Sequence, residues 1–169
     1  AAAESWDFAS PYPSFNFHGV NAQIFLQEIN ARTEGAIEIT HHGGASLYAL
    51  PEIKRAVQTR QIALGELLVS TLENEDPIFG VDAVPFLAND FDKAQKLWAA
   101  SRASIAAKLA DQGLTLLYGV SWPGQGLFTK DPITSVADLK GLIMRTQNPV
   151  TEVMAELFEA VPVLVQSAD

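Results

Sequence analysis

The hydrophobic and polar positions of this 169-residue chain alternate between two spacings. Runs that are apolar at every second position, or almost throughout, predict β-strands. These runs are residues 6–10, 36–42, 62–70, 114–121, 126–130, 142–146 and 161–165. Runs with apolar residues at helical spacing predict helices at residues 17–33, from Pro51 onward, 89–112, 135–141 and 149–160. The alternation of strands and helices predicts an α/β fold with mostly parallel sheets and helices on both faces.

One Pro/Gly-rich stretch, "SWPGQG" at residues 121–126, interrupts this alternation and indicates a hinge or domain crossing. We therefore expect a first α/β lobe over residues 1–122 and a second lobe from residue 123. Only 43 residues follow the stretch, too few for an independent α/β domain with a covered sheet. Ser167 also has the character of an N-cap just before the chain stops. We predict that the second lobe, residues 123–169, is incomplete.

The composition excludes several classes of protein. Hydrophobic residues make up 48% and charged residues 18%, which predicts a buried core rather than disorder. No apolar run reaches the roughly 18 residues of a membrane-spanning helix. The net charge of −9 disfavours nucleic acid and anionic membrane surfaces as partners. The absence of cysteine excludes disulfides, thiolate catalysis and cysteine-bound zinc.

The first residues, "AAAESWDF", begin without Met and with small side chains. Such a start is typical of the stub that signal peptidase leaves behind. A cloning remnant explains the same residues equally well, so the stub leaves both origins open.

Arg145 closes the apolar run 142–146, just before a helix that opens at Asn148 and Pro149. The carboxyl ends of parallel strands face the crevice in which open α/β sheets bind ligands. A guanidinium fork beside free N–H groups at a helix start predicts a carboxylate-binding site. The alternative is a surface arginine paired with a nearby acid, and the pattern leaves both open.

Seven further residues are candidates for the same cleft on grounds of position. Trp122, Gln125, Asn148 and Ser70 lie at or near predicted strand ends, and the loop after the first strand supplies Tyr12, Phe15 and Asn16. Trp122 is suited to stack on an apolar part of the ligand or, alternatively, to fill the core between lobes. Turn formation and helix capping by Ser14 or Asn16 is the alternative for the first loop. The aromatic residues suggest an acid with an apolar or ring substituent.

Four segments carry a resemblance to a known family. "DPITSVADLKGLIMRTQNP", "VDAVPFLANDFDKA", "SLYALPEIKRAVQTRQIALGE" and "EAVPVLVQSAD" occur in order over most of residues 46–169. Together they resemble the solute-binding proteins of tripartite ATP-independent periplasmic (TRAP) transporters. The resemblance implies a periplasmic binding protein-like fold whose two lobes close on a small organic acid. It also implies that Arg145 holds the ligand carboxylate, and that the protein works in the periplasm and delivers the acid to a membrane permease.

The sequence departs from the family pattern at three positions. Ile143 stands where the family usually has Lys, and Ala88 follows "PFL" where Phe is usual. Arg60 stands where the family tends to have Gly. A left-handed helix end would cost a non-Gly residue about 1 kcal/mol, so we expect that helix to end differently.

Other functions find weaker support in the sequence. "YGVSWPG" misses the nucleophile elbow at Pro123, and "PGQGLFT" lacks the third glycine of a dinucleotide loop. His41 and His42 are adjacent on a strand and point to opposite faces, so we predict no metal site there. We predict no enzyme activity and no cofactor. A ligand-sensing domain, a binding protein of an ATP-driven importer and, less favoured, an α/β hydrolase remain alternatives.

Overall fold

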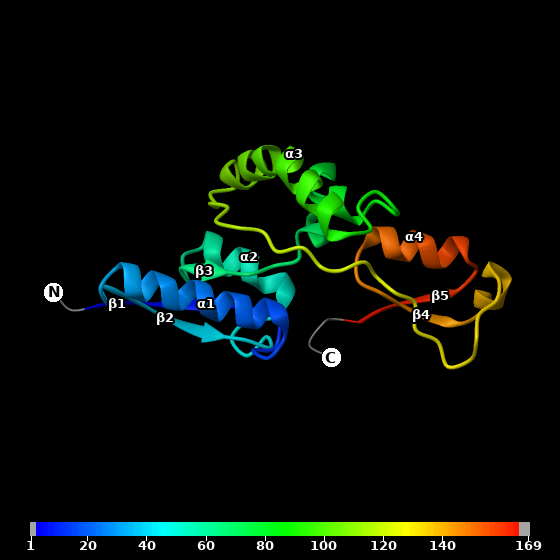
Figure 1. The fold of residues 1–169 in the computed structure, drawn as a ribbon, viewed down its shortest axis with the longest axis horizontal. Helices are drawn as coiled ribbons and strands as arrows, with labels where there is room; N and C mark the ends of the chain where they lie inside the picture. Colours follow the sequence, from blue (N-terminus) through cyan, green and yellow to red (C-terminus); the bar gives the residue numbers. More distant parts are fainter. Residues whose placement is uncertain (1–2, 166–169) are drawn as a thin grey trace. The chain divides into compact units, whose positions relative to one another are not determined.

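The computed structural model describes residues 3–165, which form two compact units. Of these residues, unit 1 comprises 3–68 and 112–114, and unit 2 comprises 69–111 and 115–165. Figure 1 shows the elements of each unit in chain order. The chain thus passes from unit 1 to unit 2 after Leu68 and passes through unit 1 again at residues 112–114, whereas the sequence suggested a lobe boundary after Trp122. That lobe boundary stays a prediction.

Unit 1 is a three-stranded parallel sheet with a helix on each face. Its strands are β1 (Glu4–Ala9), β2 (Ile37–His42) and β3 (Leu64–Gly65), in the order β2-β1-β3. Its helices are α1 (Phe17–Arg32) and α2 (Leu50–Gln58). The parallel pairing brings the carboxyl ends of all three strands to one edge of the sheet. The predicted parallel α/β arrangement is confirmed for this unit.

The core of unit 1 lies on both faces of β1, because successive side chains of a strand point in opposite directions. Phe8 packs with Ala22 and Leu26 of α1, while Ala9 packs with Ile53 of α2. All of these side chains are 5% exposed or less. At about 25 cal/mol per Å² of buried apolar area, such side chains contribute much of the stability of the unit.

The ends of α1 and α2 follow local rules. Asn16 caps the start of α1, and Gly35 lies just beyond its end with a φ of +76°, as its position predicts. Arg60 lies just beyond α2 with a φ of +60°, and the Gln61 N–H donates to the Ala56 carbonyl at 2.9 Å. This is a left-handed Schellman ending. The expectation that Arg60 forces a different helix end is therefore wrong.

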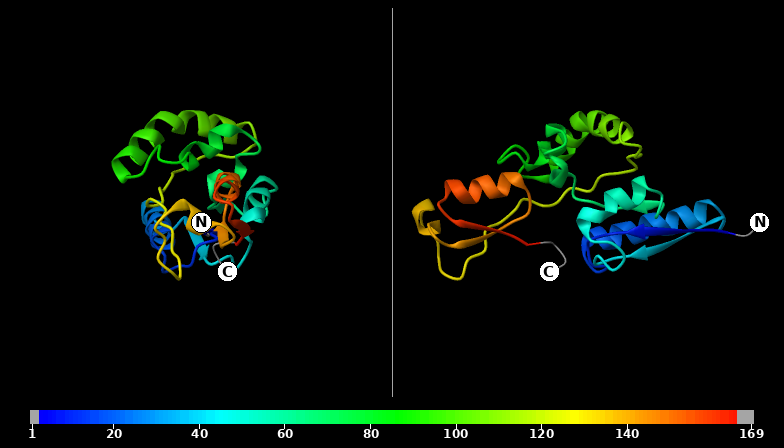
Figure 2. Two further views of the ribbon diagram at one scale, coloured as in Figure 1. Left: turned by 90° about the vertical axis from the view of Figure 1, so that its right-hand side faces the viewer. Right: turned by 180° about the vertical axis from the view of Figure 1, so that it is seen from behind.

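Unit 2 contains a parallel β-α-β unit, a long helix and three short 3₁₀ helices. The β-α-β unit consists of β4 (Ile143–Thr146), α4 (Pro149–Leu157) and β5 (Val161–Leu164). The other elements are η1 (Val69–Leu72), η2 (Pro77–Ala83), α3 (Phe91–Ala110) and η3 (Val136–Leu139). Figure 2 shows α4 running along the β4–β5 pair.

Three predicted strands are corrected by the structure. Residues 114–121 and 126–130 are in no sheet of the described chain, and the predicted strand 62–70 is reduced to Leu64–Gly65. Burial still alternates along 114–120, so one side of this extended segment packs although no ladder forms. A strand needs a partner for its backbone groups, and hydrophobic pattern does not supply one. Ser167, the predicted N-cap, lies outside the described residues.

Candidate functional site

Arg145 lies near the carboxyl end of β4, as the sequence predicts, and its side chain is exposed. Its Nε donates to the Val165 carbonyl at 3.2 Å, and its Nη1 donates to Oε1 of Gln147 at 3.1 Å. Within residues 3–165, no acidic side chain forms an ion pair with Arg145, and its Nη2 takes part in no hydrogen bond. The alternative of a surface arginine neutralised by a neighbouring acid is therefore not what this part of the chain shows.

A chain of side-chain amides holds Arg145 from one side. The Nε2 of Gln147 donates to Oε1 of Gln125 at 3.0 Å. Gln147 thus uses its oxygen for Arg145 and its nitrogen for Gln125, which places the predicted residue Gln125 in the same network. Sequence reasoning missed Gln147, although its place in the β4–α4 turn, two residues after Arg145, was the available signal. The network leaves the positive charge in place, because all its members except the arginine are neutral.

Asn148 is the N-cap of α4 and also contacts Ser70. Its Oδ1 accepts from the Thr151 N–H at 2.9 Å, and its Nδ2 donates to the Ser70 hydroxyl at 3.3 Å. The hydroxyl of Thr151 in turn accepts from the N–H groups of Gln147 and Asn148 at 3.0 and 3.1 Å. Pro149 has no N–H and the Thr151 N–H is already bonded to Asn148, so the start of α4 offers an anion fewer free donors than predicted. Its dipole remains.

Trp122 and the first loop occupy less specific environments. Trp122 is 41% exposed and follows the extended segment 114–120 rather than a paired strand. In unit 1, Phe15 is 87% exposed, whereas Tyr12 is buried with its ring 4.8 Å from that of His18. The Oδ1 of Asn16 accepts from the His18 N–H at 3.0 Å, which is the capping role. Ligand contacts by these residues stay predictions.

Unit 1 contains a polar cluster that sequence reasoning missed, composed of Ser10, His18 and Glu66 and named here the Glu66 cluster. The Ser10 hydroxyl donates to Oε2 of Glu66 at 2.7 Å, and Nδ1 of His18 lies 3.5 Å from Oε1. Ser10 is fully buried, and the side chains of His18 and Glu66 are 3% and 11% exposed. The cluster lies where β1 and β3 end. Its one signal in the sequence is Glu66, an acid inside the apolar run 62–70.

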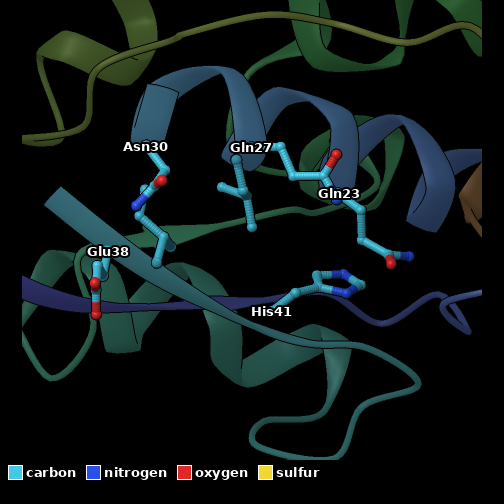
Figure 3. Close-up of a pocket in the computed structure, with 7 residues that line it drawn as sticks. Gln23, Gln27, Asn30, Glu38 and His41 are labelled. Carbon is cyan, nitrogen blue, oxygen red and sulfur yellow. The ribbon is translucent and has the colours of Figure 1, made fainter. Parts of the chain in front are cut away.

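The ring of His41, on β2, lies 5.7 Å from the ring of Phe8 on β1. Burial lowers the pKa of His41, and the charge of Glu66 opposes that shift. Figure 3 shows His41 beside an open hollow between α1 and β2, which also borders Gln23, Gln27 and Glu38. The hollow has a volume of about 340 Å³. Its lining contains none of the eight residues that the sequence predicted for the ligand.

The described residues show neither a metal centre nor a membrane span. Over residues 3–165, no three His, Asp or Glu side chains gather as metal ligands. No helix in that range combines the length and the apolar character needed to cross a bilayer. Within unit 2, the groups gathered around Arg145 are its guanidinium and the side-chain amides of Gln147 and Gln125, which can form hydrogen bonds and attract an anion.

Comparison with known proteins connects these features to a family. The family described as DctP, bacterial extracellular solute-binding protein, family 7, matches residues 9–168. Among solved structures, the chain is 44% identical to DctP6, a Bordetella pertussis extracytoplasmic solute receptor binding pyroglutamic acid, with a TM-score of 0.93. The match covers 98% of this chain and 55% of that one.

Two further structures match in the same way. DctP7 of Bordetella pertussis, also a receptor binding pyroglutamic acid, is 45% identical over 97% of this chain, with a TM-score of 0.93. A marine metagenome TRAP solute-binding protein in complex with co-purified pyroglutamate is 42% identical over 99%, with a TM-score of 0.95. Each match covers 55% of the solved chain, so this chain spans about half the length of these relatives. Comparison with curated proteins found no match.

Proposed function

The chain belongs to the bacterial extracellular solute-binding proteins of family 7, and from that premise we propose that it captures a small organic acid for a TRAP transporter. The periplasmic binding protein-like α/β fold is shared with the solved TRAP relatives, of whose length this chain spans about 55%. The extracytoplasmic location implied by the resemblance is confirmed by the family. The proposed activity is binding and delivery to a membrane permease, without chemical conversion.

One observation carries the proposal: the guanidinium of Arg145 is oriented by neutral groups and neutralised by none of the described acids. Its contacts to Val165 and Gln147 fix the plane of the fork before any ligand arrives. A fork held in this way binds a carboxylate with less loss of side-chain entropy than a free arginine would. In a protein with a net charge of −9, an arginine that neutral groups orient provides a local positive potential for an anion.

We propose pyroglutamate as the ligand, because three solved relatives at 42–45% identity bind it. Pyroglutamate is a five-membered lactam with one carboxylate, one ring N–H and one ring carbonyl. It fits the expectation of an acid with a ring substituent. Two more distant relatives, at 19% and 22% identity, have succinate and D-glucuronate bound, and they support the fold alone.

The remaining predicted residues keep graded roles in this proposal. Gln125 positions Arg145 through Gln147, and Trp122 supplies an exposed ring for the apolar side of the ligand. Phe15, in unit 1, stays a predicted ligand contact. Tyr12 and Ser70 are each 3% exposed: Ser70 supports Asn148 by accepting a hydrogen bond from its Nδ2, and Tyr12 packs against His18. Asn16 and Asn148 act first as helix caps. Family membership favours this reading over a sensing domain, an ATP-driven importer or a hydrolase.

The direct test is ligand identification followed by calorimetry. Mass spectrometry of the acid released from the purified protein is expected to find pyroglutamate. Titration with pyroglutamate, succinate, D-glucuronate and the neutral amide of pyroglutamate is expected to show tight binding of pyroglutamate alone. The neutral amide removes only the charge that Arg145 would hold, so its binding as tightly as the acid would contradict the proposal. Failure of every acid in the panel to bind would also contradict it.

A further inference from the structure

We propose that Arg145 sets the direction of the hydrogen bonds in its amide chain, so that Gln125 presents N–H donors and the site selects acids that carry a carbonyl beside the carboxylate. The inference rests on the proposed function, in which Arg145 binds the ligand carboxylate. It concerns a second group of the ligand, and every residue that it invokes belongs to unit 2.

The direction of the amide chain follows from the chemistry of arginine. A guanidinium donates hydrogen bonds and accepts none, so the Gln147 amide has to turn its oxygen toward Arg145. Its Nε2 then donates to Oε1 of Gln125 at 3.0 Å. Because Oε1 of Gln125 is the acceptor in this bond, its Nε2 is the group that remains. The arginine thus decides which end of the Gln125 amide is available to a ligand.

The available end of Gln125 is a donor with no other use among the described residues. Within residues 3–165, Nε2 of Gln125 takes part in no hydrogen bond, and the side chain is exposed. An amide nitrogen carries two N–H groups, and it accepts no hydrogen bond. Successive hydrogen bonds also polarise one another, so a cation at the start of the chain strengthens the donors at its end. Gln125 is therefore prepared for an acceptor such as a carbonyl oxygen.

The guanidinium and the Gln125 amide are close enough for one small ligand. They contact the same amide group, that of Gln147, at 3.1 and 3.0 Å. Nη1 of Arg145 and Oε1 of Gln125 are therefore roughly 8 Å apart at most. Val165 and Gln147 use two of the five guanidinium N–H groups, which leaves three for a carboxylate. A five-membered ring that carries a carboxylate and a carbonyl, as pyroglutamate does, has one group for each residue.

A structural role, in which the two glutamines only hold Arg145, must be separated from this one. A ratio of two affinities makes the separation. 3-Oxocyclopentanecarboxylate has its carbonyl at the ring position where pyroglutamate has it, and cyclopentanecarboxylate lacks only that carbonyl. Weaker support for Arg145 would affect both acids alike, whereas loss of the Gln125 donor would affect the keto acid alone.

Isothermal titration of the wild-type protein and of Q125E with pyroglutamate and these two acids tests the proposal. The wild type is expected to bind the keto acid about three- to tenfold more tightly than cyclopentanecarboxylate. Gln125→Glu keeps an oxygen for the Gln147 amide but has no N–H, so this ratio should fall to about one or below.

Gln147→Glu tests the direction of the chain without changing Gln125. A carboxylate accepts from both neighbours, so Gln125 has to turn its nitrogen inward and its oxygen toward the ligand. The ratio should again fall to about one. Both acids should also bind at least about tenfold more weakly, because the new carboxylate pairs with Arg145. A structural role of the glutamines predicts the weaker binding with an unchanged ratio.

Gln95→Glu is the matched control, because Gln95 is an exposed residue of α3 in unit 2. Q95E adds the same charge as Q125E and Q147E, and Gln95 takes part in none of the hydrogen bonds described above. It is expected to keep the wild-type ratio. If Q147E binds neither acid measurably, the ratio in Q125E decides.

Equal wild-type affinities for the two acids would overturn the role of Gln125 and leave the proposed function standing. Binding of pyroglutamate with neither of the two acids, or an unchanged ratio in Q125E or Q147E, would do the same. Failure of the wild type to bind pyroglutamate and both acids would overturn both proposals.

Discussion

Replacement of Arg145 tests the central electrostatic claim. Arg145→Ala removes the one group proposed to bind the ligand carboxylate, while Arg145→Lys keeps the charge and loses the planar fork. Lys cannot reproduce the simultaneous contacts of Nε with Val165 and of Nη1 with Gln147. Both variants are therefore expected to weaken ligand binding, the alanine variant more than the lysine variant.

The expected magnitude follows from the pairing of the guanidinium. Loss of one partner of a desolvated, hydrogen-bonded charge pair costs about 2–5 kcal/mol, which corresponds to roughly a 30- to 5,000-fold rise in Kd. The stability of the protein should change by only about 0.5 kcal/mol, because Arg145 is exposed and has no acidic partner among residues 3–165. The effect should thus appear in binding and not in folding.

The assay is calorimetric titration with the acid found in the purified protein, beside thermal unfolding of each variant. Arg102→Ala is the control, because Arg102 is an exposed arginine of α3 in the same unit. It removes the same charge and is expected to leave Kd within about twofold. Unchanged affinity in R145A, or an equal loss in R102A and R145A, would refute the reasoning.

Three further outcomes concern stability. Arg60→Gly should raise the free energy of unfolding by about 1 kcal/mol in urea denaturation, because the φ of residue 60 is +60°. The control Arg55→Gly, within α2, should lower it by about as much. If R60G gains no stability, the left-handed conformation assigned to residue 60 is contradicted. Asn148→Ala should lower the free energy of unfolding by about 1 kcal/mol in urea denaturation, because the Thr151 N–H loses its acceptor, and Asn148→Asp should recover most of that loss. An equal loss in both variants would contradict the capping role of Asn148. The hydrogen bond from Lys108 lowers the pKa of Asp76. The contribution of this ion pair to the free energy of unfolding is therefore complete above the ordinary carboxyl pKa of about 4, and it is lost as the pH falls through the lowered pKa. Asp76→Asn removes the charge but keeps the side-chain oxygen that accepts from the Ile78 N–H. The difference in unfolding free energy between wild type and D76N should be constant near neutral pH and should shrink below about pH 4. A difference that does not depend on pH would refute this linkage.

The candidate site was predictable where it depends on neighbouring residues in the chain. Arg145 at the end of a strand and Asn148 at the start of a helix could be selected from sequence because strand ends and helix caps are local features. Gln125 was selected from the Pro/Gly-rich stretch, and its contact with Gln147 spans 22 residues. Gln147 and the Glu66 cluster were missed. Glu66 meets Ser10 across 56 residues, and no local pattern indicates a contact over that distance.

The sequence by itself determined the four α-helices of the described residues and most of their ends, although the left-handed end of α2 at Arg60 was not expected. A helix satisfies its backbone groups within four residues, so the apolar spacing of α3, its cap Asp90 and the stop at Gly113 suffice to place it. A strand depends on a partner elsewhere in the chain. The apolar run 114–121 predicted a strand as strongly as residues 36–42 did, yet only the latter found a partner, in β1. Pairing of strands, and the approach of Ser10, His18 and Glu66, were decided by the tertiary structure, because both require groups distant in sequence to meet.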